Sequence, residues 1–157
     1  MKIVFLTIGK TINKHLIELQ SDYQERLKHY IPYDYISIPE LKNNKNLSES
    51  EQKEKEADLL LKMLEPTDEV ILLDEKGKQF GSVEFSDFIS KKIMGNQKRM
   101  IFVVGGPYGF SQRVYERANG LISLSKMTFS HQMVRIIFVE QLYRAFTILR
   151  GEPYHHQ

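Results

Sequence analysis

The chain has 157 residues, of which 41% are hydrophobic and 27% charged, a balance typical of one globular domain with one core. The absence of cysteine excludes disulfides and thiolate metal sites, and the net charge of +2 permits a nucleic-acid partner without indicating one. The apolar segment after Met1-Lys2 is too short for a signal peptide, and no apolar run reaches membrane-spanning length. We therefore expect one domain over residues 1–157, cytoplasmic and without a membrane partner.

The first half of the chain alternates short apolar runs with helical periodicity. Residues 2–8 are β-branched and apolar before a glycine, which predicts a buried strand. Apolar residues at helical spacing predict a helix over 12–29, and a short strand follows at 34–39. A capping-box pattern that begins at Ser48 predicts a second helix over 48–65, after an exposed polar loop.

The second half repeats this alternation, with a loop expected over 75–82. Strands are expected at 69–74, 99–104 and 120–126, and helices at 83–94, 111–118 and 131–149. Strands that alternate with helices predict an α/β fold, with a mostly parallel sheet and helices on both faces.

The last helix, expected over 131–149, carries an apolar stripe too wide for a helix that lies on one sheet with its back in water. Two explanations remain open at this point. The helix is either enclosed within a single chain, or a second chain covers its outer face. We favour the second explanation, which predicts a homodimer.

A glycine-rich turn, Gly105-Gly106-Pro107-Tyr108-Gly109, follows the strand at 99–104. No lysine follows as a P-loop requires, and the glycine spacing and position differ from those of a dinucleotide fingerprint. Pro107 also removes one amide that a phosphate would need. A plain tight turn remains open, as does a ligand without phosphate, such as S-adenosylmethionine, whose adenine needs an apolar slot and backbone hydrogen bonds.

Several segments together resemble one known family. The strings LLDEKGK, FVVGGPYG, LSLSKMTFSHQMVR, EQLYRAF and GEPYH are similar to those of the ribosomal RNA large subunit methyltransferase H family, and the resemblance covers the whole chain. Members of this family are 23S rRNA (pseudouridine(1915)-N(3))-methyltransferases of the SPOUT superfamily. The resemblance implies an α/β fold with a deep trefoil knot in its C-terminal half, and an obligate homodimer.

The resemblance also implies the ligands and the substrate. The methyl donor is expected to be S-adenosyl-L-methionine, with S-adenosyl-L-homocysteine as product and no metal. The partner is expected to be 23S rRNA within the large subunit or the 70S ribosome. The implied cofactor contacts are Leu73, Gly105, Gly106, Leu124, Ser125, Lys126, Met127, Thr128 and Phe129.

Three residues near the C-terminus are the expected catalytic residues. A ring N–H attacks a methyl group only as its anion, so the site must take up the proton and stabilise the charge. Arg144, which matches the family's Y-R-A string, is expected to steady the anion, and a surface ion pair with Glu140 is the alternative. Tyr154 is expected to orient the base and His155 to accept the proton, with the tail folded over a site of the partner chain.

Other polar residues have open roles. His131 fits either a structural histidine or a base, and Arg135 is expected to contact phosphate or to cap structure. The residues expected to hold RNA electrostatically are Lys10, Lys14, Lys76, Lys78, Arg113, Arg117 and Lys126. Two further functions remain: a non-catalytic RNA- or ribosome-binding factor on the same scaffold, and a nucleotide-dependent enzyme such as an oxidoreductase.

Overall fold

The structure, a computed structural model, describes residues 1–156, and its centre is a parallel sheet. The strand order is β2-β1-β4-β3-β5, and every pair of neighbouring strands is parallel. This confirms the parallel sheet expected from the sequence. The strands are β1 (Lys2–Ile8), β2 (Tyr33–Ile38), β3 (Glu69–Gln79), β4 (Arg99–Val104) and β5 (Gly120–Ser123).

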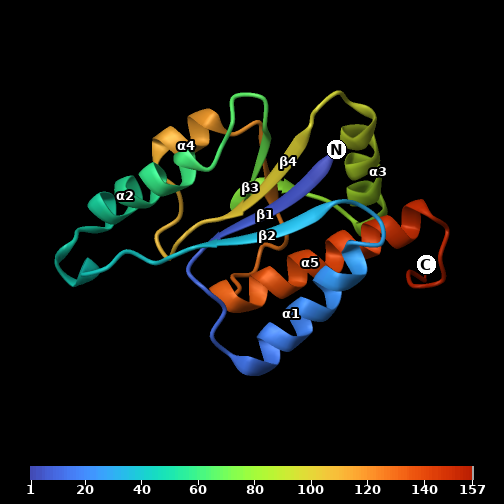
Figure 1. Ribbon diagram of the computed structural model, residues 1–157, viewed down its shortest axis with the longest axis horizontal. Helices are drawn as coiled ribbons and strands as arrows, with labels where there is room; N and C mark the ends of the chain where they lie inside the picture. Colours follow the sequence, from blue (N-terminus) through green and yellow to red (C-terminus); the bar gives the residue numbers. More distant parts are fainter. Residues whose placement is uncertain (157) are drawn as a thin grey trace.

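Helices cover both faces of the sheet. Figure 1 shows α2 and α4 on one side of the sheet, with α1 and α5 on the opposite side. The helices are α1 (Lys14–Leu27), α2 (Glu49–Lys62), α3 (Ser82–Met94), α4 (Gln112–Arg117) and α5 (His131–Leu149), with a short 3-10 turn at Asn44–Asn46. The expected capping box at the start of α2 is present, because the Ser48 hydroxyl accepts from the Glu51 amide while the Glu51 carboxylate accepts from the Ser48 amide.

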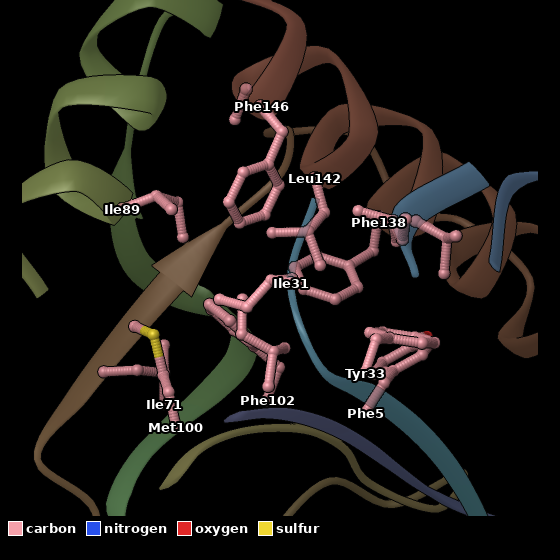
Figure 2. Close-up of a cluster of buried hydrophobic side chains, with 14 of the residues drawn as sticks. Phe5, Ile31, Tyr33, Ile71, Ile89, Met100, Phe102, Phe138, Leu142 and Phe146 are labelled. Atoms are coloured by element: carbon pink, nitrogen blue, oxygen red, sulfur yellow. The ribbon is translucent and has the colours of Figure 1, made fainter. Parts of the chain in front are cut away.

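The core on the α1, α3 and α5 face is built around two aromatic contacts of Phe138 (Figure 2). The ring of Phe138 on α5 lies 4.7 Å from that of Phe5 on β1 and 4.8 Å from that of Phe102 on β4, between ring centroids. All three side chains are fully buried. Burial of each ring stabilises the fold by about 1.5–3 kcal/mol, so the middle of α5 is fixed onto the two central strands.

The opposite face has its own core, which explains the unbroken apolar run of β1. Val4 and Leu6 pack with residues of α2 and α4, while Ile3 and Phe5 belong to the α1, α3 and α5 face. Because alternate residues of a strand point to opposite faces, a strand covered on both sides is apolar throughout.

The expected loop at 75–82 is wrong in its first part, because β3 continues to Gln79. Leu73 and Lys78 both pair with Ile122 of β5, so the residues between them bulge out of the ladder. Gly77 makes this possible, since a Cβ at that position would lie 2.5 Å from the Ile122 backbone. The apolar pattern of β3 ends at the bulge, and for this reason the sequence of residues 75–79 is typical of a loop.

The strand expected at 120–126 is also too long, because β5 ends at Ser123. Beyond it the Ser125 hydroxyl accepts a hydrogen bond of 2.9 Å from the Met127 amide, a local turn that competes with strand pairing. The Ser130 hydroxyl then caps α5 by accepting from the Met133 amide. Residues 124–130 are therefore an irregular connection.

The apolar stripe of α5 is largely explained by packing within the chain. Six of its apolar side chains are buried against the sheet and the neighbouring helices α1 and α3: Ile136, Phe138, Val139, Leu142, Ala145 and Phe146. Met133 and Leu149 remain exposed at the two ends. The width of the stripe alone therefore does not require a second chain. No helix within residues 1–156 is long and apolar enough to span a membrane.

Candidate active site

A pocket of about 410 Å³ lies beyond the carboxyl ends of β4 and β5 and beside the bulge of β3. In parallel sheets this edge is where ligands bind. Of the nine residues expected to contact a cofactor, eight line this pocket, and Lys126 is the exception, with an exposed side chain. The eight lining residues are Leu73, Gly105, Gly106, Leu124, Ser125, Met127, Thr128 and Phe129.

The strand order brings together segments that are distant in the chain. Leu73 on β3 pairs with Val104 on one side and with Ile122 on the other, so the ends of β4 and β5 lie on either side of the β3 bulge. The backbone segments that follow Leu73, Val104 and Ile122 therefore face the same pocket. Pocket residues from 73 and from 124–129 are thus neighbours because β3 lies between β4 and β5.

The glycine-rich turn forms one wall of the pocket and is itself tightly built. The Gly109 amide donates to the Gly106 carbonyl at 3.1 Å, and Gly109 has a φ of +78°, which favours glycine. A Cβ at Gly105 would lie 3.0 Å from the buried ring of Phe110, so this residue also leaves no room for a side chain. The glycine-rich segment is therefore a tight turn, which was one of the two alternatives left open by the sequence, and it also lines the pocket.

A second wall comes from residues that sequence reasoning did not select. The Tyr115 hydroxyl on α4 donates a 2.6 Å hydrogen bond to Asp74 at the β3 bulge, and both residues line the pocket. Burial and this hydrogen bond raise the pKa of Tyr115, so the phenol stays protonated and donates. Asp74 lies within the LLDEKGK string, but nothing in the local sequence pairs it with α4.

His131, the first residue of α5, faces the same pocket. Desolvation, followed by the positive charge of Arg135, lowers the pKa of His131, while Glu40 acts in the opposite direction. The imidazole is therefore neutral at pH 7, which is compatible with a hydrogen-bonding role at the pocket edge.

The pocket fits an adenosyl ligand in volume and chemistry. Small-molecule sites of this kind are mostly apolar with a few polar groups, and Leu73, Leu124 and Phe129 supply the apolar lining. Close backbone approach is possible at Gly105 and Gly106, where a side chain would collide with the protein. Within residues 1–156 no group of three or more His, Cys, Asp or Glu side chains could hold a metal ion.

The three expected catalytic residues come together at the other end of α5. Glu140 Oε1 accepts hydrogen bonds from Arg144 Nη2 at 2.5 Å and from the Tyr154 hydroxyl at 3.0 Å. The Arg144 guanidinium lies 4.7 Å from the centre of the Tyr154 ring, a cation–π contact. The Tyr154 hydroxyl also lies 3.1 Å from that of Tyr23 on α1. The tail is thus folded onto α1 and α5 of its own chain.

His155 contacts Arg144 through a specific ring nitrogen. Arg144 Nη1 lies 3.3 Å from His155 Nδ1. A guanidinium has no acceptor, so Nδ1 must accept this hydrogen bond and a neutral His155 carries its proton on Nε2. Nδ1 is the nitrogen with the free electron pair, and it can take up a proton only when the contact with Arg144 opens.

The ion pair expected as the alternative role of Arg144 is present, and its role toward the anion stays a prediction. The ion pair with Glu140 is present, but Arg144 is half-buried and also contacts the tail, so it is more than a surface pair. Burial raises the pKa of Tyr154, aided by the hydrogen bonds to Tyr23 and Glu140, so the phenol remains neutral. Sequence reasoning missed Tyr23, whose helical position gives no sign of a contact with the C-terminus.

The pocket and the tail cluster lie at opposite ends of α5. His131 lines the pocket and Arg144 begins the tail cluster, and 13 residues of helix at 1.5 Å per residue place them about 20 Å apart along the axis. Within one chain, the structure therefore brings the three catalytic candidates together but does not bring them to the pocket.

Some basic residues expected to contact RNA are used within the protein. Arg135 is only 3% exposed and donates to the Ile8 carbonyl at 2.8 Å, so its role is structural and the expected phosphate contact is wrong. Arg117 donates to the carbonyls of Glu65 and Asp68, and Arg113 pairs with two carboxylates of α2. The side chains of Lys10, Lys14 and Lys126 are exposed.

Comparison with known proteins gives the family. The family model described as "Predicted SPOUT methyltransferase" matches residues 1–155, in agreement with the expected knotted α/β class. Curated relatives named "Ribosomal RNA large subunit methyltransferase H" are 59% identical in Flavobacterium johnsoniae, 58% in Parabacteroides distasonis and 55% in Bacteroides fragilis, each alignment covering 100% of both chains. The chain belongs to the ribosomal RNA large subunit methyltransferase H family of SPOUT methyltransferases.

Proposed function

We propose that the protein transfers a methyl group from S-adenosylmethionine to N3 of pseudouridine 1915 in 23S rRNA of the assembled ribosome. One observation on the structure supports this proposal in addition to the family membership. The pocket at the ends of β4 and β5 and the bulge of β3 gathers eight of the nine residues that the family resemblance implies as cofactor contacts. Its apolar lining and its glycine backbone suit a nucleoside without phosphate better than a dinucleotide, which disfavours an oxidoreductase.

The pocket residues have distinct roles in this proposal. Leu73, Leu124 and Phe129 enclose the adenine, and the backbone at Gly105 and Gly106 lies close to the ribose and the amino-acid portion. When bound, the cofactor supplies a methyl group on a positively charged sulfur. The protein contributes enclosure and alignment of the two reacting atoms, and no metal is needed.

The reaction breaks the N3–H bond of the base and the S–CH3 bond, and it forms an N3–CH3 bond. The proton from N3 goes to His155 Nδ1, and the sulfur keeps its electron pair as neutral S-adenosylhomocysteine. Arg144 faces the nitrogen anion and lowers the cost of forming it, while Tyr154 stacks on or orients the base. Opening of the Arg144–His155 contact frees His155 Nδ1 as the proton acceptor and releases Arg144 Nη1, while Nη2 stays paired with Glu140.

The active site is completed by a second copy of the chain. The tail cluster lies about 20 Å from the pocket of its own chain, a distance at which side chains on one helix do not meet. The exposed apolar side chains Met127, Met133 and Leu149 near the two ends of α5 provide surface for a partner. In the homodimer, the tail of one protomer lies over the pocket of its partner.

The protein works in the cytoplasm, where ribosomes are found, as one unit over residues 1–157, of which Gln157 lies outside the described residues. The described residues 1–156 form one α/β fold, and we expect them to recognise the shape of the assembled ribosome. The exposed lysines Lys10, Lys14 and Lys126 contact RNA phosphates.

The test uses the full-length protein and ribosomes from cells that lack it. Labelled S-adenosylmethionine is supplied with 70S ribosomes, and the 23S rRNA is mapped by mass spectrometry. We expect one added methyl group, at N3 of pseudouridine 1915. A methyl group at another nucleotide would contradict the substrate. A protein that binds 70S ribosomes but neither binds nor consumes the cofactor would be a non-catalytic factor.

A further inference from the structure

Helix α2 buries two polar side chains on the face that packs against the sheet. Glu56 is 4% exposed and Gln52, one turn earlier, is 7% exposed, and they share this face with Ala57 and Leu60. Burying a carboxyl group costs free energy that an apolar side chain at the same position would not. The fold alone would therefore favour an apolar residue at position 56, and the carboxyl group requires another explanation.

The Glu56 carboxyl group lies against the wall of the cofactor pocket. A Cβ built on Gly106 would lie 2.6 Å from Glu56 Oε1, so the carboxyl group occupies the space that a side chain there would need. Gly106 lines the pocket and Glu56 does not. The carboxyl group is therefore separated from the pocket by the backbone of one glycine-rich turn, which contributes no side chain at that point.

Among residues 1–156, no Lys, Arg or His side chain forms an ion pair with Glu56. Its hydrogen-bond partner is Gln52, whose Nε2 donates to Oε1 at 3.0 Å. The ion pairs among residues 1–156 join other carboxylates, and none includes Glu56. Burial raises the pKa of Glu56, the hydrogen bond from Gln52 lowers it, and the like charge of Glu40 raises it. A negative charge at this position is thus left without a partner in the protein.

We propose that the Glu56 carboxylate is the counter-charge for the cationic sulfur of the bound methyl donor. The inference rests on the proposed cofactor site. S-Adenosylmethionine and S-adenosylhomocysteine share adenine, ribose and the amino-acid head, and they differ in the methyl group and its positive charge. A buried carboxylate behind Gly106 attracts the sulfonium and gains no such attraction from the neutral thioether of the product, because charges interact strongly where water is excluded. Glu56 therefore favours binding of the substrate over retention of the product.

The experiment measures the affinity of both ligands by calorimetry at pH 8 for the full-length wild-type protein and for Glu56→Gln, which keeps the shape and removes the charge. We expect Glu56→Gln to weaken S-adenosylmethionine binding about tenfold and to change S-adenosylhomocysteine binding less than twofold. Glu49→Gln is the matched control, because it removes an exposed carboxylate from the same helix, and it should change neither affinity. If Glu56→Gln did not fold, Glu56→Met would take its place, with the same expectation.

The outcomes separate this inference from the proposed function. Equal weakening of both ligands would show that Glu56 acts through the turn or through the amino-acid head that both ligands share, and not on the sulfonium. Unchanged affinity for both would show that its charge does not reach the pocket. Either result overturns the inference while leaving the cofactor site intact. A wild-type protein that bound neither ligand would overturn the proposed function, and the inference with it.

Discussion

The hydroxyl group of Tyr30, near the end of α1, donates a 2.5 Å hydrogen bond to the carboxylate of Glu152, 122 residues later in the chain. The guanidinium of Arg150 lies 4.4 Å from the centre of the Tyr30 ring. Together these contacts attach the start of the tail to α1. The position of Tyr154 and His155 therefore depends on a tyrosine far from them in sequence.

Tyr30→Phe should loosen the tail without disturbing the core, because it removes the donor and keeps the ring. We expect a loss of about 1 kcal/mol in the free energy of unfolding, measured with urea. We also expect faster trypsin cleavage after Arg150 and a several-fold lower methylation rate, with unchanged affinity for S-adenosylmethionine. Unchanged protection of Arg150 from trypsin would show that this hydrogen bond does not hold the tail.

Arg144→Ala and deletion of residues 153–157 should each abolish methylation of 70S ribosomes and keep the affinity for S-adenosylmethionine within twofold of wild type. The reason is that the tail cluster lies at the end of α5 opposite the pocket, so it serves the methyl acceptor. Initial rates and calorimetry separate the two effects. Arg113→Ala is the control, because Arg113 is an exposed arginine that pairs with carboxylates of α2. Normal turnover in either altered protein would contradict the proposed catalytic role.

Gly106→Ala should weaken binding of S-adenosylhomocysteine about tenfold, because the new Cβ collides with the Glu56 carboxyl group and displaces the turn. Adding Glu56→Ala removes the collision and should restore most of this affinity. The neutral product is the correct ligand here, since its binding does not depend on the charge of Glu56. A double variant as weak as Gly106→Ala alone would show that the defect arises elsewhere in the turn.

Glu56→Gln should stabilise the protein at pH 8 and much less at pH 5. Burial raises the pKa of Glu56 in the folded state above its usual value of 4.5. A group with a raised pKa in the folded state contributes stability below its unfolded pKa and loses it as pH rises through the folded pKa. The gain on substitution must therefore grow with pH. Urea unfolding at both pH values measures it, and an equal gain at both would show that the carboxyl group does not change ionisation in this range.

The sequence predicted the alternation of strands and helices, because each central strand is covered on both faces and reads as a continuous apolar run. It failed at the bulge of β3, where Gly77 allows pairing to resume after the apolar pattern has ended. It failed again at β5, where Ser125 forms a turn within a segment that reads as a strand. Both errors come from local contacts that periodicity does not record.

The sequence predicted those parts of the candidate site in which the position of a residue at the end of a strand decides where it lies. The pocket residues follow strand ends, and the sheet brings strand ends together. For Arg135 both a phosphate contact and a structural role stayed open, because a sequence does not show that a charged side chain is buried against the Ile8 carbonyl. Glu56 escaped notice for the same reason, since it stands among the exposed charges of α2 and only packing distinguishes it.

Because two residues of β3 pair with Ile122, the residues that line the pocket can vary without a change in the pairing of the sheet. Leu73 and Lys78 pair with the same residue of β5, so the segment between them leaves the sheet and rejoins it at one position. Asp74, Glu75 and Lys76 of this segment line the pocket. Changes of length or residue type there would alter the lining of the pocket, while the pairing of β3 with β5 would resume at the same residue.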